Sequence, residues 1–325
     1  MWRYLARRVA YAVPILIGVN LITFALFFVV NSPDAMARMH LGDKRVTQEA
    51  VERWKADHGY DRPLLYNADA PGAARLTDTI FFTKSARLFV LDFGRADDGR
   101  DITRDIRARM GPSLAIAIPT LLIALGLNIA LALGIALLRA SYADRAAMAA
   151  AVVLMSISSL FFIIAGQYLF ARVLRLVPVS GYADGLDALR FVTLPVLVSV
   201  VAGLGAGVRW YRTLFLEELG RDYVRTARAK GLPERVVLFG HVLRNAMIPI
   251  LTGVVVQLPL LFMGSLLVES FFAIPGLGSY TVDAIRAQDF SIVRAMVFLG
   301  ALLYVVGLVL TDISYTLADP RVRLR

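Results

Sequence analysis

The chain of 325 residues alternates between long apolar runs and segments that carry most of its charged side chains. A helix of about 20 apolar residues spans the ~30 Å hydrocarbon layer of a membrane. The pattern therefore predicts an all-α polytopic membrane protein with six transmembrane helices. Their expected ranges are 9–30, 114–138, 147–171, 191–208, 246–268 and 295–311.

The composition agrees with a membrane protein. Hydrophobic residues make up 58% of the chain, charged residues 18%, and the mean hydropathy is +0.65. A soluble core of this size does not need so many apolar residues. The absence of cysteine excludes disulfides and thiolate metal sites. His40, His58 and His241 are too few and too scattered for a metal centre, so we expect no metal or cofactor in this chain.

The distribution of cations predicts that both termini lie in the cytoplasm, because cytoplasmic loops carry an excess of Lys and Arg. The segments assigned to the inside hold 16 such residues, whereas the two short outside loops with their flanks hold five. The first run, 9–30, is longer than the ~7–15 apolar residues of a signal peptide. We therefore interpret it as an uncleaved helix despite the cleavage-like Ala35-Met36-Ala37. Asp319-Pro320-Arg321 is expected to end the last helix at the cytoplasmic surface.

A polar insertion at residues 31–112 separates the first two runs and is expected to form an extracytoplasmic loop region. It holds 14 Lys and Arg against 13 Asp and Glu, and loops longer than ~60 residues are translocated largely regardless of charge. The stretch 67–90 has two interpretations. It either caps the outer mouth or touches a delivery protein, or it forms a loop with a small core of its own without such a role.

A short surface helix is expected inside this insertion, over 47–58. Thr47 is a suitable N-cap, and Gly59 is a suitable stop. Val51 and Trp54 would share the face that packs against the rest of the protein.

The segment 217–249 concentrates charge between two apolar runs. It holds four acids and six cations, so it cannot lie inside the bilayer and is expected on the cytoplasmic side. The cations are Arg221, Arg225, Arg228, Lys230, Arg235 and Arg244.

The pattern within this segment predicts two short helices. Tyr223, Val224 and Ala227 give the first an apolar stripe, which Leu232 continues after the break. Gly231 is expected to cap that helix, and a second helix is expected to begin at Pro233 and to enter the membrane near Met247. Such a protruding pair suits the groove of a partner protein. It equally suits the surface of an anionic membrane, and the pattern alone leaves both open.

Residues 222–232 read Asp-Tyr-Val-Arg-Thr-Ala-Arg-Ala-Lys-Gly-Leu, and His241-x-x-Arg244-Asn245-Ala246 and Pro249 follow. This stretch resembles the cytoplasmic loop of ABC importer permeases of the dipeptide, oligopeptide and nickel family. In that family the loop is a variant of the EAA motif and forms the coupling helix that docks on the ATPase subunit. Arg225 stands where many members carry Glu, and the proline comes later, as the peptide-type branch allows. The resemblance assigns ATPase coupling to Asp222, Tyr223, Arg225, Thr226, Ala227, Arg228, Ala229, Lys230, Gly231 and Leu232.

The resemblance implies the type I ABC importer permease fold in a bacterial cytoplasmic (inner) membrane, in the subunit type with a long first periplasmic loop. It implies a segment 1–30 with the first helix, the loop region 31–112, and a core permease domain 113–325 with the coupling loop 217–245. The implied partners are a second related permease, two ABC ATPase subunits that hold ATP and Mg, and an extracytoplasmic solute-binding protein. The lipid bilayer is expected as surroundings, and no nucleic acid.

Four side chains are candidates for the translocation pathway. Gln257 lies near the middle of the fifth run, and Asn128 and Gln167 lie in other runs; each either lines the pathway or makes an interhelical hydrogen bond. Glu269 opens a stretch that resembles the family's E-T-x-F-x-x-P-G-L-G segment, and it either screens the solute or caps the loop. Small residues at Gly126, Ala130 and Gly134, and at Gly203 and Gly207, predict close helix packing.

Other function classes lack their machinery in this sequence. The chain has no G-x-x-x-x-G-K-[ST] loop, so ATP would be hydrolysed on separate subunits. The alternative of a self-sufficient secondary transporter or channel lacks ionisable residues at the centres of the runs and a visible inverted repeat. An intramembrane enzyme lacks H-E-x-x-H, paired carboxylates and G-x-S-x-G. The solute stays open among peptides, nickel chelates, sugars and peptide antibiotics.

Overall fold

The computed structural model describes residues 2–42 and 46–318 of the chain. These residues are almost entirely helical, and no strand occurs among them beyond one isolated bridge between Arg95 and Asp101. The all-α prediction is therefore confirmed. The predicted end of the last helix at Asp319-Pro320-Arg321 lies outside the described residues.

The chain divides into two compact units. The first comprises Met1–Arg109 and Tyr280–Val309, and the second comprises Met110–Ser279 with the stretch that starts at Leu310. The first unit begins with α1 (Trp2–Phe24), η1 (Ala25–Val30), α2 (Pro33–Leu41), α3 (Gln48–His58), α4 (Ala74–Thr77), η2 (Phe81–Ser85) and η3 (Ala86–Val90). Three helices run from one unit into the other: α5 (Ile102–Leu137), α13 (Leu277–Ala287) and α14 (Phe290–Ala318).

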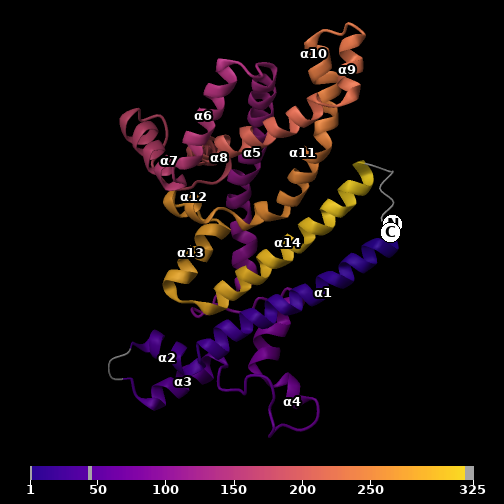
Figure 1. Ribbon diagram of the computed structural model, residues 1–325. Coiled ribbons are helices and arrows are strands. Elements are labelled where there is room, and N and C mark those ends of the chain that lie inside the picture. The colour runs from indigo at the N-terminus through magenta and orange to yellow at the C-terminus, as the bar shows by residue number, and fades with distance from the viewer. Residues whose placement is uncertain (1, 43–45, 319–325) are drawn as a thin grey trace. The chain divides into compact units, whose positions relative to one another are not determined.

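The second unit contains the remaining elements, which Figure 1 colours from magenta to orange. They are α6 (Tyr142–Ser156), α7 (Ser159–Gly166), η4 (Gln167–Val173), η5 (Gly185–Asp187), α8 (Ala188–Leu219), α9 (Asp222–Ala229), α10 (Glu234–Val236), η6 (Val237–Val242), α11 (Leu243–Gln257), η7 (Pro259–Met263) and α12 (Leu266–Phe271).

Within the described part of the chain, five helical stretches are long and apolar enough to cross a membrane, and a sixth arises if one bent helix pair counts as a single span. The five are Ala10–Val30, Ile102–Leu137, Gly185–Leu219, Glu234–Phe271 and Phe290–Ser314. The bent pair replaces the continuous third helix that the sequence predicted, since α6 and α7 meet at 89°. The bend occurs because Ile157 is extended and the Ser158 side chain accepts a hydrogen bond from the Leu160 N–H, which starts a new helix.

The predicted surface helix in the loop region is confirmed as α3. The Thr47 side chain accepts a hydrogen bond from the Ala50 N–H, and Gly59 ends the helix in the left-handed conformation with φ of 67°. Val51 is fully buried and Trp54 is half-buried, so they mark the packed face.

A small aromatic core holds the first unit together. Phe24, Phe28, Met36, Tyr60 and Ile80 are buried, and Trp54, Phe81 and Phe290 pack against them. The loop region thus buries apolar side chains of its own together with residues of η1 and α14. Of residues 67–90, Ile80 and Phe81 belong to this shared core, and both interpretations of the stretch stay predictions.

Close helix packing in the second unit depends partly on other glycines than expected. A side chain at Gly205 would collide with the Ala151 carbonyl, so this glycine lets α6 approach α8. Gly207 leaves space for the Asn128 side chain of α5. Gly126, Gly134 and Gly203 have no such neighbours in this chain, and the small-residue pattern there does not mark a packed intrachain contact.

A buried ion pair joins α6 to α8. The guanidinium of Arg212 donates from Nε to Asp144 Oδ1 and from Nη2 to Asp144 Oδ2, both at 2.8 Å. Asp144 is 5% exposed and also accepts a hydrogen bond from the Ala140 N–H. This bidentate geometry fixes the distance and orientation between the two helices.

A second buried carboxylate organises the turn between α12 and α13. Glu269 is 1% exposed, and its oxygens accept hydrogen bonds from the Ser265 N–H at 3.1 Å and the Ser279 N–H at 3.0 Å. Ser113 of α5 completes the arrangement by accepting a hydrogen bond from the Leu277 N–H at 2.8 Å. A side chain at Gly264 or Gly276 would collide with this carboxylate, so both positions require glycine.

We predict that Asp144→Ala lowers the free energy of unfolding by about 3 kcal/mol, because it leaves the Arg212 guanidinium part-buried without its partner. Thermal or denaturant unfolding of the detergent-solubilised protein would measure this loss. Asp184→Ala, at an exposed acid of the same unit, serves as the control. The double variant Asp144→Ala/Arg212→Met should be more stable than Asp144→Ala alone; equal stability of all variants would contradict the prediction.

We further predict that Gly276→Ala destabilises the protein by about 1–3 kcal/mol, since the new methyl group overlaps the Glu269 carboxylate and Ser113. Gly111→Ala is the matched control, because nothing lies within 4 Å of the added atom. That control should be at least as stable as the unchanged protein, because Ala favours a helix over Gly. Equal unfolding midpoints for both variants would refute the role of the glycine.

Candidate functional site

The basic segment forms the helix α9 (Asp222–Ala229) with one buried face. Val224 is fully buried and Ala227 is 4% exposed, while Tyr223 is half-buried beside them. The predicted apolar stripe is therefore confirmed for these three residues. Leu232, which was expected to extend the stripe, is 36% exposed at the corner that follows.

Gly231 ends α9 in the manner that the sequence predicted. Its φ of +75° lies in the left-handed region, which residues with a side chain rarely adopt. The Gly231 N–H donates to the Arg228 carbonyl at 2.9 Å, and the Leu232 N–H donates to the Ala227 carbonyl at 3.4 Å. This pair of bonds is a Schellman motif, and it turns the chain sharply away from α9.

The second predicted helix starts directly after this corner. Pro233 is its N-cap, and the helix continues through α10, the π-helical turn η6 and α11. Figure 1 shows α9 and α10 beside each other at the end of α11. The predicted pair of short helices is thus present, and its second member extends directly into a candidate membrane span.

An apolar cluster anchors α9 to the membrane-spanning helices. Val224 and Ala227 pack into it with side chains from α5, α8, η6 and α11, all of them at most 8% exposed. These neighbours are Ala132, Leu133, Ala136, Phe215, Leu219, Val237, Leu238, Val242, Ala246 and Ile250. Because such interiors are closely packed, a displacement of α9 must move the ends of the helices behind it.

Tyr223 adds a polar contact at the edge of this cluster. Its hydroxyl donates a hydrogen bond to Glu218 Oε2 at 2.6 Å. Burial, followed by the hydrogen bond to the Glu218 carboxylate, raises the pKa of Tyr223 to about 12. The hydroxyl therefore keeps its proton at physiological pH and stays a donor.

The opposite face of α9 is exposed and basic. From Arg221 to Arg235 the chain has five cations and two acids, and all seven side chains are exposed. The Arg228 guanidinium pairs through both Nε and Nη2 with the Glu234 carboxylate, which ties α9 to α10. The remaining positions of the predicted coupling set, apart from the half-buried Tyr223 and the buried Ala227, are also open to a partner. They are Asp222, Arg225, Thr226, Ala229, Lys230, Gly231 and Leu232.

The four pathway candidates occupy different surroundings. The Gln257 side chain is exposed at the end of α11. Asn128 is 5% exposed and lies against Gly207. Gln167 donates hydrogen bonds from Nε2 to the carbonyls of Val179 and Phe271 at 3.1 and 3.0 Å.

These bonds fit a structural role for Gln167, and those to Glu269 fit its interpretation as a cap of the loop. The interhelical hydrogen bond expected of Asn128 is not found, because its amide oxygen is buried without a partner among the described residues. Lining of the translocation pathway stays a prediction for all four residues. The structure brings no two of them into a shared hydrogen bond among the residues it describes. Gln257 alone presents its amide on the surface of this chain.

Sequence reasoning missed the Asp144–Arg212 ion pair near the basic segment. The sequence did carry a signal for the helix start that positions Asp144, because Ser141 and Asp144 have the spacing of an N-cap pair. In the structure the Ser141 side chain accepts a hydrogen bond from the Asp144 N–H. Nothing in the sequence pattern pointed from Asp144 to Arg212, which lies 68 residues later.

Comparison with known proteins places these features in a family. The profile of the family described as "binding-protein-dependent transport system inner membrane component" matches residues 126–324, a range that includes α9 and its anchor. The profile of the N-terminal region of such membrane components matches residues 1–68.

Three relatives align over nearly their whole length. The dipeptide transport system permease protein DppB of Bacillus subtilis is 31% identical, and the alignment covers 100% of this chain and 99% of DppB. The oligopeptide transport system permease protein AppB of the same organism is 28% identical, and the alignment covers 99% of each chain. A protein of Brucella abortus, provisionally named a peptide transport system permease, is 33% identical over 99% of each chain. This chain therefore belongs to the family of inner membrane permease components of binding-protein-dependent ABC transport systems.

Proposed function

We propose that this chain is a permease subunit of an ATP-driven importer for peptides or peptide-like solutes. In this proposal it forms the translocation pathway together with a related permease subunit. Two separate ATPase subunits bind ATP and Mg, and an extracytoplasmic binding protein delivers the solute. The names of the relatives, which refer to peptide, dipeptide and oligopeptide transport, support the choice of solute.

The observation that carries the proposal is the two-sided character of α9. One face is locked into the apolar cluster through Val224 and Ala227, and the other presents a basic, solvent-exposed surface. A helix that only rested on a membrane surface would direct its apolar face toward the lipid. In α9 that face is already occupied by the permease's own helices.

The connection from α9 to the membrane spans suggests how movement is transmitted. The Schellman corner at Gly231 and the ion pair between Arg228 and Glu234 join α9 firmly to the helix that becomes α11. Closure of the ATPase subunits on ATP would push α9, and the apolar cluster would pass this displacement to α8 and α11. Tilting of these helices then alternates access at the interface with the second permease.

We predict that Arg225→Glu uncouples this transporter without unfolding it, because its own ATPase must complement the cation that stands here in place of the Glu of many relatives. The Arg225 side chain is 77% exposed and makes only a 3.5 Å ion pair with Asp222, so stability should change little. Charge reversal at a docking surface should weaken ATPase binding by about 30-fold, as expected for loss of a hot-spot contact. The measurements are copurification of the ATPase subunits with the permease and solute-stimulated ATP hydrolysis in proteoliposomes.

The matched control is Arg53→Glu on α3. Its side chain is also 77% exposed and also pairs with one acid on its own helix, Glu49. This variant should retain both copurification and stimulated hydrolysis. Uptake of a peptide by the permease alone, with no ATPase present, would refute the proposal in favour of a self-sufficient transporter.

A further inference from the structure

A buried arginine in the first unit has no ion pair among the residues that the structure describes. Arg294, in the first turns of α14, is 3% exposed, and its Nε makes no hydrogen bond with any described residue. Its guanidinium carbon lies 5.2 Å from the centroid of the Phe28 ring, which packs against it without neutralising its charge. A guanidinium does not lose its proton in proteins, so its charge persists on burial and calls for an anion.

Arg294 lines a pocket of about 620 Å³ in the first unit, a size typical of sites for small ligands. Lys84, Tyr60 and Ser291 line the same pocket. The Lys84 ammonium lies 5.2 Å from the centroid of the Tyr60 ring. Burial, with repulsion from Arg294, lowers the pKa of Lys84, and the nearby Asp97 carboxylate opposes this shift. Lys84 and Arg294 thus place two cations in one cavity.

Two acids act on Arg294 through their charge, Asp289 and Asp97, and both carboxylates have other partners. Asp289 accepts hydrogen bonds from the Asp97 N–H at 2.9 Å and from the Ile292 N–H at 3.0 Å, and so caps α14. Asp97 Oδ2 lies 3.6 Å from His40 Nε2. Both carboxylates act on Arg294 only through their charge, since neither forms an ion pair with it among the described residues.

The charges around the pocket are balanced overall. Four cations and four acids line it, with one pair, Arg87 and Asp92, joined at 3.6 Å. Asp57 lines the pocket as well and has an exposed side chain. A cavity lined by charges of both signs complements a ligand that carries both signs and no net charge.

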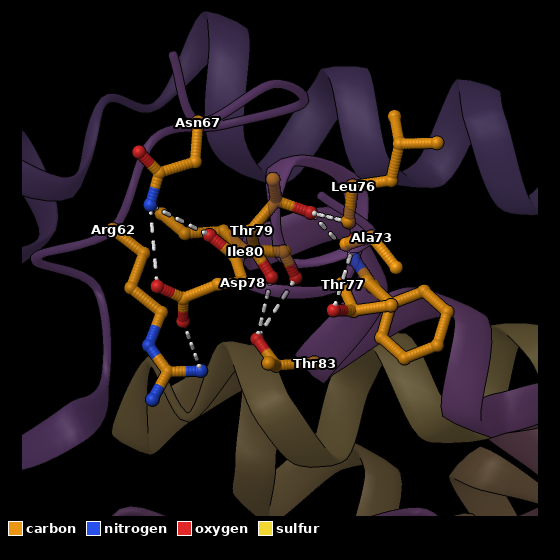
Figure 2. A network of polar contacts seen from close by, with 10 residues as sticks. Arg62, Asn67, Ala73, Leu76, Thr77, Asp78, Thr79, Ile80 and Thr83 are labelled. Atoms are coloured by element: carbon orange, nitrogen blue, oxygen red, sulfur yellow. Dashed lines mark hydrogen bonds and ion pairs between the residues drawn. The ribbon is translucent and has the colours of Figure 1, made fainter. Parts of the chain in front are cut away.

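The wall that carries Lys84 is held in place by a polar network, shown in Figure 2. Asp78 accepts a hydrogen bond from Asn67 Nδ2 at 3.2 Å and pairs with Arg62 at 3.2 Å. The Thr83 hydroxyl donates to the Thr79 carbonyl at 2.8 Å. Because these contacts fix the start of η2, Lys84 faces the pocket from an ordered wall and not from a free loop.

We infer that this pocket binds a short zwitterionic peptide, with Arg294 and Lys84 donating to its terminal carboxylate and with Asp57 and Asp97 facing its ammonium group. The inference rests on the proposed function, since it places a contact for the peptide in the polar loop region of the permease itself. A guanidinium and an ammonium together suit a carboxylate, because both supply charge-assisted hydrogen bonds to its oxygens.

The test is isothermal titration of the full chain in lipid nanodiscs with trialanine. Trialanine amide, which lacks the carboxylate, should bind at least tenfold more weakly, as expected for loss of charge-assisted bonds. Lys84→Met should weaken trialanine binding by a similar factor. It should also reduce the difference in affinity between trialanine and its amide, since only Arg294 then recognises the carboxylate. Arg294→Gln should abolish measurable binding, and Arg53→Gln should leave it unchanged.

Lys84 is half-buried and joins no ion pair among the described residues, so Lys84→Met keeps the test meaningful if Arg294→Gln fails to fold. Three results would each overturn the inference. The unchanged protein could bind trialanine and its amide with equal affinity, trialanine at millimolar concentration could give no heat, or Lys84→Met could leave binding unaltered. Uptake of trialanine by the assembled transporter is measured in parallel. Normal uptake without pocket binding would refute only this inference, whereas pocket binding without ATP-dependent uptake would refute the proposed function.

Discussion

Burial of Val224 and Ala227 in the apolar cluster is the interaction on which the proposed coupling depends. These two small contacts attach an eight-residue helix, which would be unstable alone, to three longer helices, α5, α8 and α11, and to the turn η6. The same burial directs every exposed cation of α9 outward. A basic helix without this anchor could not pass a push from its surface to α8 and α11. The stability of the local structure and its proposed function thus have one physical origin.

Buried charge is used in three different ways in this chain. Asp144 meets the Arg212 guanidinium in a bidentate pair, which fixes two helices. Glu269 accepts hydrogen bonds from backbone N–H groups, which fix a turn rich in glycine. Arg294 has neither kind of partner among the described residues. Because an unpaired buried charge is costly, this contrast is what singles out Arg294 as a binding residue and leaves the other two as structural residues.

Two interruptions of regular helix shape the second unit. The sharp bend at Ile157 divides an apolar run that is long enough to cross a membrane, and the π-helical turn η6 lies between the corner at Gly231 and α11. Irregular backbone of this kind frees carbonyl and N–H groups, which a membrane protein tolerates only where other groups satisfy them.

The sequence by itself determined the local features, because each depends on side chains a few residues apart. Helix periodicity and backbone sterics account for four of them: the cap at Thr47, the stop at Gly59, the stripe of Val224 and Ala227, and the left-handed corner at Gly231. Hydropathy alone also located five of the six spans.

Only the tertiary structure decided which distant residues meet. Three contacts depend on how the helices pack: Asp144 with Arg212, Asn128 with Gly207, and Gly205 with Ala151. Hydropathy carries no information about such partners. The burial of Arg294 beside Lys84 is of the same kind, since 210 residues separate them in sequence (294 − 84). Periodicity predicts the face that a helix buries, whereas the fold alone selects what covers that face.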